Sequence, residues 1–326
     1  MKVHILDDWF DTLRHLRSFE KLAGHEVTVW TDHCADIEIL ADRLADAEVL
    51  VLFRERTAVN EALLARLPKL RLISQRGVYP HVDVAACTRH GVVLSSNQSE
   101  GRASTAAAEL TFALILAGAR RLPDQIASLR AGNWQCGVGQ SLEGRRIGLY
   151  GYGRIAQKVA DYAHAFGMSV WWWGSEAGRA RAAQDGQTVA PDRAAFFAQS
   201  DVVSLHVRLK PETRGIVTAQ DLSAMKPGAI LFNTSRAALL AEGALDAALA
   251  AGRPGTICLD VFDREPMTAP VDPRLTHPNI IATPHIGFVT EDELDLQFGD
   301  IYDQITAYYA GAPIHVINPE ALDAPR

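Results

Sequence analysis

The chain has 326 residues, more than the roughly 250–300 at which a single hydrophobic core stops growing, so we expect two domains. It is 48% hydrophobic and 22% charged, as is typical of globular proteins, and its net charge of -7 argues against a nucleic acid as the main partner. Its four cysteines have no Cys-x-x-Cys spacing, so neither a zinc site nor a disulfide framework is indicated, and no metal is expected.

The N-terminus lacks the apolar stretch of a signal peptide, because Met1-Lys2-Val3 leads at once into a strand that ends in Asp7 and Asp8. The longest apolar stretch, residues 110–119, is about half as long as a membrane span. We therefore expect a cytoplasmic protein with no membrane partner.

The first hundred residues alternate between strand and helix patterns, which is typical of a parallel sheet with helical crossovers. Helical patterns separate the strands, for example at residues 36–45 and 60–67. A long alanine-rich helix is predicted over residues 102–120, with Ser99 or Ser104 as its N-terminal cap and Arg120 and Arg121 at its C-terminal end. The five strands predicted before it lie at residues 3–6, 27–30, 49–53, 72–74 and 92–94.

A second series of strands begins after this helix, at residues 147–150, 170–173, 202–206, 229–233, 256–260 and 280–283. The second of these contains three consecutive tryptophans, which we explain by burial of the strand on both faces. Residues from Glu291 to before Gly311 have a helical pattern, and an extended arm follows. The whole pattern predicts the α/β class, with two doubly wound parallel-sheet domains.

A glycine-rich turn separates the first strand of the second series from an amphipathic helix. In Gly151-x-Gly153-x-x-Ala156, Gly151 permits the tight turn, Gly153 permits close approach of a phosphate, and Ala156 permits close packing of helix on strand. The turn is therefore expected to bring backbone N–H groups and the helix start, at Arg154 and Ile155, to the pyrophosphate of a dinucleotide.

Polar side chains follow the last three strands of the second series. Arg236, Glu265 and His285 each come shortly after one of these strands. In a doubly wound domain the ligand lies outside the carboxyl ends of the strands. A guanidinium can grip a carboxylate, an imidazole is the general acid–base of neutral pH, and a nearby carboxylate fixes the tautomer of the imidazole. The three residues together predict a site for hydride transfer.

At these residues the chain resembles the D-isomer-specific 2-hydroxyacid dehydrogenases, a family that includes glyoxylate and hydroxypyruvate reductases, and the resemblance covers nearly its whole length. The segments that carry it are Gly151-Tyr-Gly153-Arg-Ile-Ala156, Ser204-Leu-His-Val-Arg-Leu-Lys-Pro-Glu-Thr-Arg-Gly215, Met225-Lys-Pro-Gly228, Asn233-Thr-Ser-Arg236, Leu259-Asp-Val-Phe-Asp-Arg-Glu-Pro266 and Thr283-Pro-His-Ile-Gly287.

The resemblance implies a role for each residue of the predicted site. Arg236 is similar to the family's substrate-binding arginine, Glu265 to the partner of the histidine, and His285 to the general acid–base. The cofactor-facing positions that the resemblance implies are Asp260, at the nicotinamide carboxamide, together with His206 and Thr234.

The resemblance also implies a domain organisation. Residues 1–100 and 291–326 would form a flavodoxin-like substrate domain, into which a Rossmann cofactor domain of residues 101–290 is inserted. Members of the family form dimers through the cofactor domain. The helix at 102–120 and the segment after it are too apolar to be left in solvent, so we expect a homodimer.

The chain departs from the family's pattern in the loop that holds the substrate carboxylate. This loop reads Gly77-Val78-Tyr79-Pro80-His81, one residue shorter and bulkier than usual. Gly77 and Val78 are expected to supply N–H donors to the substrate, whereas the roles of Tyr79 and His81 are left open. Arg208 stands where a proline is usual, and its role is open too.

A further departure concerns the choice of cofactor. Gly174 and Ser175 follow the second strand of the cofactor domain, where an acidic residue would bind the adenosine ribose of NAD(H). Ser175, Arg179 and Arg181 could instead bind a 2′-phosphate, although Glu176 opposes this. We therefore expect an NAD(P)(H)-dependent protein with a slight preference for NADP(H), and NAD(H) stays open.

The favoured function is hydride transfer between NAD(P)(H) and a small 2-oxo or 2-hydroxy acid, specific for the D isomer. One alternative is oxidation of a one-carbon or inorganic donor on the same scaffold, as formate and phosphite dehydrogenases perform. Another is a nucleotide-sensing binding protein that resembles the corepressors built on this fold.

Overall fold

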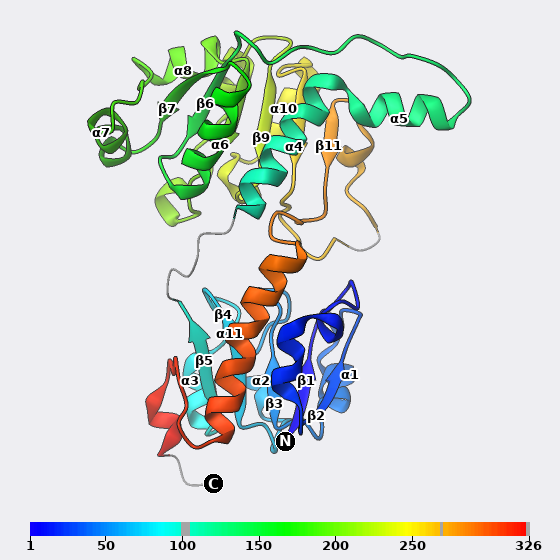
Figure 1. The fold of residues 1–326 in the computed structure, drawn as a ribbon, viewed down its shortest axis with the longest axis vertical. Coiled ribbons are helices and arrows are strands. Elements are labelled where there is room, and N and C mark those ends of the chain that lie inside the picture. Colours follow the sequence, from blue (N-terminus) through cyan, green and yellow to red (C-terminus); the bar gives the residue numbers. More distant parts are fainter. Residues whose placement is uncertain (99–104, 268–269, 324–326) are drawn as a thin grey trace. The chain divides into compact units, whose positions relative to one another are not determined.

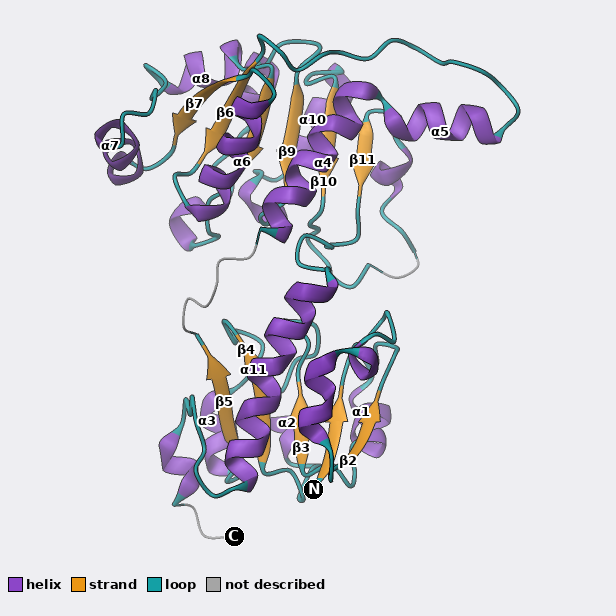
Figure 2. Cartoon of the chain, viewed as in Figure 1, coloured by secondary structure: helices purple, strands orange, loops and turns teal. Residues whose placement is uncertain are grey.

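The computed structural model describes residues 1–98, 105–267 and 270–323, and the chain divides into two compact units. Unit 1 comprises Met1–Arg102 and Val289–Arg326, and unit 2 comprises Ala103–Phe288. Each unit has a parallel sheet with helices on both faces (Figures 1 and 2). The predicted α/β class with two doubly wound parallel sheets is confirmed.

The sheet of unit 1 has the strand order β2-β1-β3-β4-β5, and all its strand pairs are parallel. The five strands predicted for this part of the chain are confirmed, with small shifts at their ends. Because the chain begins inside the sheet, its direction of travel reverses between β1 and β3, which is the switch point of this unit. The strands are β1 (Lys2–Ile5), β2 (Glu26–Val29), β3 (Val49–Val51), β4 (Leu72–Arg76) and β5 (Val93–Asn97).

Short helices cover one face of this sheet and the long C-terminal helix α11 (Glu291–Tyr309) covers the other (Figure 1). Alternate strand residues, such as Leu50 and Ile73, pack beneath the short helices. The short helices are α1 (Ile37–Arg43), α2 (Glu61–Leu64) and α3 (Val84–Arg89), and the 3-10 turns are η1 (Leu13–His15), η2 (Arg17–Leu22) and η6 (Pro319–Leu322).

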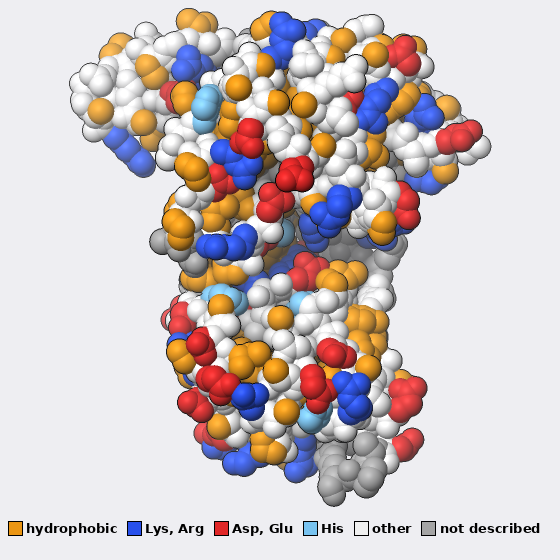
Figure 3. Space-filling view, turned by 180° about the vertical axis from the view of Figure 1, so that it is seen from behind, with side chains coloured by type: hydrophobic (Ala, Val, Ile, Leu, Met, Phe, Trp, Pro, Cys, Tyr) orange, Lys and Arg blue, Asp and Glu red, His pale blue; other side chains and the backbone are white. Residues whose placement is uncertain are grey.

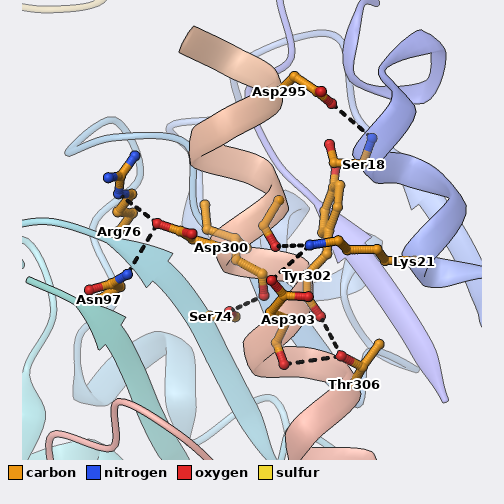
Figure 4. A network of polar contacts seen from close by, with 12 residues as sticks. Ser18, Lys21, Ser74, Arg76, Asn97, Asp295, Asp300, Tyr302, Asp303 and Thr306 are labelled. Carbon is orange, nitrogen blue, oxygen red and sulfur yellow. Dashed lines mark hydrogen bonds and ion pairs between the residues drawn. The ribbon is translucent and has the colours of Figure 1, made fainter. Parts of the chain in front are cut away.

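Polar contacts fix α11 to the sheet at several points (Figure 4). The buried Ser74 hydroxyl donates to the Ile301 carbonyl at 2.9 Å. The Asp300 carboxylate bonds to the side chains of Arg76, at 3.0 Å, and Asn97, at 3.1 Å, which end β4 and β5. The C-terminal helix therefore determines where the carboxyl ends of these two strands lie.

The sheet of unit 2 has the strand order β11-β10-β9-β8-β6-β7, and all its strand pairs are parallel. All six predicted strands are confirmed. A parallel bridge from Trp172 to Val189 adds a rudimentary strand beyond β7. The strands are β6 (Arg146–Tyr150), β7 (Ser169–Trp173), β8 (Val202–Leu205), β9 (Ile230–Asn233), β10 (Thr256–Leu259) and β11 (Ile280–Ala282).

Helices α4 (Ala106–Arg120) and α6 (Arg154–Ala165) pack on one face of this sheet. The other face is covered by α8 (Arg193–Gln199), α9 (Ala219–Ala224) and α10 (Ala244–Ala251). Apolar side chains pack between these layers on both faces of the sheet, as the burial of a parallel sheet on both faces requires.

One local prediction is tested only in part, and another is corrected. The helix predicted over 102–120 is described from Ala106, with Thr105 at its N-cap, and the proposed caps Ser99 and Ser104 lie outside the described residues. Of the three tryptophans, Trp172 is buried, but its neighbours are only half-buried. The guanidinium groups of Arg146 and Arg179 cover the rings of Trp171 and Trp173, at 3.8 and 4.2 Å from the ring centroids, so cations complete the packing.

An exposed apolar segment follows α4. Helix α5 (Leu122–Arg130) contains no buried residue, and together with the segment after it projects from the rest of unit 2 (Figure 1). The segment after it carries exposed apolar side chains. Leu129, Trp134 and Val138 are 61%, 73% and 91% exposed.

Elsewhere, acidic and basic side chains are interspersed over the face drawn in Figure 3. No helix in the described ranges combines the length and apolar character that crossing a bilayer requires.

Candidate active site

The glycine-rich turn lies at the switch point of unit 2, between β6 and β8. Gly151 has a φ of +114°, and a Cβ there would lie 2.6 Å from the His206 carbonyl oxygen, so only glycine fits. Gly153 has an extended backbone, and a Cβ on it would meet no atom within 4 Å. The space over Gly153 is therefore open, as the predicted approach of a phosphate requires.

Helix α6 begins directly after this turn, and its first N–H groups have no acceptors within the helix. The N-cap Gly153 supplies no side-chain acceptor for them either. Arg154 and Ile155, at the start of the helix, are exposed, whereas Ala156 is buried against the sheet. These features form an anion-binding helix terminus that fits a dinucleotide pyrophosphate.

His285 and Glu265 form a hydrogen-bonded pair at the carboxyl ends of β10 and β11. The Nδ1 atom of His285 contacts the Oε2 atom of Glu265. The other carboxylate oxygen of Glu265 accepts a hydrogen bond from the Phe262 N–H at 2.8 Å. The carboxylate thereby fixes the orientation of the imidazole and leaves its Nε2 atom to face a ligand.

Burial opposes ionisation of Glu265, but the hydrogen bond and charge of His285 outweigh it, and the pKa of Glu265 lies below its ordinary value of 4.5. The Phe262 N–H and the charge of Arg236 act in the same direction. Glu265 is therefore negatively charged throughout the neutral pH range. The charge of Arg236 therefore acts on the same carboxylate that His285 contacts, which links the three residues predicted from the strand ends.

Arg236 lies just after β9 and is exposed. Its backbone is fixed because its carbonyl accepts a hydrogen bond from the buried Asn233 side chain at 2.8 Å. Its guanidinium donates to the Ser235 carbonyl at 2.7 Å. The Ser235 hydroxyl in turn donates to the Val207 carbonyl, which ties this segment to the end of β8. These hydrogen bonds hold the segment that carries the guanidinium at the carboxyl end of β9.

Asp260, at the end of β10, holds the loop that carries His285. One oxygen of its buried carboxylate accepts hydrogen bonds from the Thr283 hydroxyl, at 2.6 Å, and the Ile286 N–H, at 2.8 Å, and the other accepts from the Gly287 N–H at 2.9 Å. Burial raises the pKa of Asp260 despite these donors. Its main contacts in the described chain are therefore with this loop, a function that its position in the sequence did not suggest.

The two other cofactor-facing candidates lie along the same edge. His206 follows β8, and its Nε2 atom lies 2.9 Å from the Ser204 hydroxyl. Burial lowers the pKa of His206 to about 4, so its ring is neutral at pH 7 and unsuited to donate a proton there. Thr234 follows β9, and its hydroxyl lies 2.9 Å from the Thr111 hydroxyl of α4.

The edge at the end of β7 contains the residues predicted to select the cofactor. Ser175 is the N-cap of α7 (Glu176–Gln184) and accepts a hydrogen bond from the Gly178 N–H. Arg181 reaches back to donate to the Tyr152 carbonyl inside the glycine-rich turn, at 3.3 Å. Gly174 has a φ of +147°, so an acidic residue at this position would be strained.

In unit 1, the loop after β4 is organised differently from our expectation. The Gly77 N–H donates to the Asn97 carbonyl at 3.0 Å and so is not available to a substrate. Val78 is 62% exposed, and its N–H has no acceptor in the described chain. Both ring nitrogens of His81 are buried without a hydrogen-bond partner among the described residues, and burial lowers its pKa against the charges of Glu55 and Asp7.

Two further points of the sequence concern a metal site and Arg208. Within residues 1–98, 105–267 and 270–323, no group of three or more His, Cys, Asp or Glu side chains is placed to hold a metal ion. Arg208 is exposed on the segment after β8, where its carbonyl accepts a hydrogen bond from the Thr213 hydroxyl.

Comparison with known proteins gives consistent results. Residues 112–287 match the family model of the D-isomer specific 2-hydroxyacid dehydrogenase NAD binding domain. A D-3-phosphoglycerate dehydrogenase of Methanocaldococcus jannaschii is 37% identical over 78% of this chain, and a glyoxylate reductase of Thermococcus litoralis is 31% identical over 91%. The chain spans about half the length of the first (48%) and 92% of the second.

A solved structure described as a putative D-3-phosphoglycerate dehydrogenase oxidoreductase from Ralstonia solanacearum is 43% identical, with a TM-score of 0.93. The similarity covers 99% of this chain and 98% of that one. The matched range of the family model contains both the glycine-rich turn and the strand-end residues described above. The chain belongs to the D-isomer specific 2-hydroxyacid dehydrogenase family.

Proposed function

We propose that this protein transfers a hydride between a nicotinamide dinucleotide and a small 2-oxo or 2-hydroxy acid, with the D configuration at the alcohol carbon. The observation that carries the proposal is the hydrogen bond between His285 and Glu265, whose carboxylate also feels the charge of Arg236, at the sheet edge that also holds the glycine-rich turn. A proton donor, an anion-binding group and a pyrophosphate site on one edge are what such a reaction needs.

In the direction of reduction, the bound nicotinamide supplies the hydride. Arg236 binds the carboxylate of the acid and polarises its carbonyl group, because a guanidinium forms paired hydrogen bonds with a carboxylate. His285 donates a proton to the carbonyl oxygen as the hydride arrives. Glu265 stabilises the imidazolium before transfer, and Asp260 holds the loop that positions it.

The two units have separate roles in this proposal. Unit 2 is the cofactor domain, and unit 1 is the substrate domain, which contributes backbone donors from the loop after β4. We expected the N–H groups of both Gly77 and Val78 to bind the substrate. Only the Val78 N–H is available for this, because the Gly77 N–H donates to the Asn97 carbonyl. The names of the relatives support small 2-oxo acids such as glyoxylate as first substrates to test.

The first prediction tests the proton donor. His285→Ala should lower kcat for glyoxylate reduction by about 10²–10⁴ and leave the dissociation constant of the dinucleotide nearly unchanged, because only the transition state loses a contact. Steady-state kinetics and cofactor fluorescence measure the two quantities. His164→Ala, an exposed histidine of α6, is the control and should behave like wild type. A kcat near the wild-type value in His285→Ala would refute the assignment.

The second prediction concerns pH. Because the pKa of Glu265 is lowered, its charge is present above pH 4.5 and is lost only as the pH falls through the lowered value. In Glu265→Gln the charge is absent at every pH, so the proton-donating form of the site should disappear at a lower pH. The alkaline limb of kcat/KM for reduction should move by about 1 pH unit toward acid.

The control for this pH profile is Asp263→Asn, which removes an exposed carboxylate two residues away. Its alkaline limb should coincide with that of wild type. An unchanged limb in Glu265→Gln would show that Glu265 does not stabilise the proton-donating form.

The third prediction concerns the choice of cofactor. We propose a slight preference for NADP(H), supported by the reach of Arg181 to the glycine-rich turn and by the position of Arg179 on Trp173. Ser175→Asp retains an N-cap for α7 and adds a charge that repels a 2′-phosphate, so it should shift the preference toward NADH by about 10-fold. Gly174→Asp is a poor test because of the strained backbone.

The ratio of kcat/KM with NADPH to that with NADH measures this preference. Arg181→Gln should shift the ratio in the same direction as Ser175→Asp, and Lys158→Gln, on the exposed side of α6, should not shift it. A wild-type preference for NADH above about 100-fold, roughly 2.7 kcal/mol, would contradict the proposal.

The fourth prediction concerns assembly. We propose a homodimer through unit 2, supported by the exposed apolar side chains of α5 and of the segment after it. Wild type should sediment as a dimer at micromolar concentration, and Leu129→Glu combined with Trp134→Glu should sediment as a monomer. Leu322→Glu changes an exposed leucine of unit 1 and should leave the dimer intact. A monomeric wild type would refute this assembly.

A further inference from the structure

The loop of Gly77 and Val78 is held by its carbonyl groups. The Ser96 hydroxyl donates to the Gly77 carbonyl at 2.7 Å. The side-chain Nε2 of Gln75 donates to the carbonyls of both Gly77 and Val78, each at 3.3 Å, and to the Ser96 hydroxyl at 3.1 Å. Two consecutive peptide groups of the loop are therefore anchored to one amide nitrogen beneath them.

The direction of these carbonyls determines the direction of the next N–H groups. In a trans peptide the C=O and the N–H point in opposite directions. Because the carbonyls of Gly77 and Val78 both point toward Gln75, the N–H groups of Val78 and Tyr79 point away from it, on the same side of the loop. Neither N–H has an acceptor in the described part of the chain. Adjacent N–H groups on one side of a turn form an anion-binding concavity.

Gln75 is suited to this task because it is fixed and uncharged. Its side chain is 1% exposed, and its backbone carbonyl accepts a hydrogen bond from Gln304 of α11 at 3.2 Å. A buried amide is costly unless its hydrogen bonds are made, and here its two N–H groups are shared among the loop carbonyls and Ser96. Because the amide is uncharged, it holds the loop in place and adds no negative charge that would repel a bound anion.

We infer that Gln75, assisted by Ser96, is a positioning residue that presents the N–H groups of Val78 and Tyr79 to the carboxylate of the substrate. This inference rests on the proposed function for the identity of the anion. It assigns Tyr79 a role through its backbone N–H, and it gives Gln75 a role in substrate affinity without contact to the substrate.

The test uses Gln75→Met in the full-length chain, because methionine has a similar length and no donor. Its KM for glyoxylate should rise about 10- to 100-fold, since a small misplacement of binding groups has effects of this size. Its kcat should change less than about 3-fold, and its affinity for the dinucleotide should equal that of wild type. Ser74→Ala is the control, because the Ser74 hydroxyl is equally buried but bonds to α11 rather than to the loop.

A second variant and a direct binding measurement keep the inference open to refutation. Ser96→Ala is a smaller change that removes the 2.7 Å bond to Gly77, and it should raise KM in the same direction. Oxalate, an unreactive dicarboxylate, is titrated into the protein with bound dinucleotide, by calorimetry and by ¹⁵N-resolved NMR. The amide signals of Val78 and Tyr79 should shift in wild type, and Gln75→Met should bind oxalate about 10- to 100-fold more weakly.

The outcomes separate the two proposals. If no 2-oxo acid is reduced but oxalate shifts both amide signals and binds weakly to Gln75→Met, the proposed function fails and the role of Gln75 stands. If glyoxylate is reduced while Gln75→Met retains wild-type KM and oxalate affinity, the function stands and the role of Gln75 is refuted. Absence of any oxalate effect on the two amides in wild type refutes it as well.

Discussion

The rest of the site depends on the hydrogen bonds that the Asp260 carboxylate accepts from the loop after β11. Three hydrogen bonds from Thr283, Ile286 and Gly287 converge on this buried group, and the loop between them must turn at His285. His285 accordingly has a φ of +53°, a left-handed conformation that is uncommon for a residue with a side chain. This conformation places the imidazole against Glu265, to which its Nδ1 atom is hydrogen-bonded.

Both units place polar groups at the carboxyl ends of their strands, but the kind of group differs between them. In both, the carboxyl ends of parallel strands carry the polar groups, as expected for doubly wound sheets. Unit 2 uses ionisable groups, with an arginine, a histidine and two carboxylates along its edge. Unit 1 uses neutral side chains, Gln75 and Ser96, to aim backbone N–H groups. Charged groups suit the proton and hydride chemistry, and oriented amides suit the binding of a carboxylate.

The strands of both sheets were predictable because a parallel strand buried on both faces is a short apolar run, such as Val49–Val51. The strand-end residues were predictable for a related reason, since chain order and parallel pairing bring the ends of β9, β10 and β11 together. The pairing of His285 with Glu265 was correctly anticipated from these ends and from the family resemblance.

Other features depend on contacts between distant segments, and the sequence does not reveal them. The use of the Gly77 N–H by Asn97 arises from the register of β4 and β5, and the role of Gln75 arises from its position beneath the loop. No sequence motif singles out Gln75, which lies near the end of β4. The tryptophan run was misjudged because arginine side chains can cover an exposed ring face as well as a helix can.

The fate of a deuterium label tests most directly whether a hydride passes from the nicotinamide to the substrate. Glyoxylate is replaced by 2-oxobutyrate, so that the product is chiral, and the nicotinamide carries deuterium at the transferable position. Direct hydride transfer predicts D-2-hydroxybutyrate with one deuterium at C2, which mass spectrometry and chiral chromatography can measure together. A product with solvent hydrogen at C2, or the L isomer, would contradict direct hydride transfer at this site.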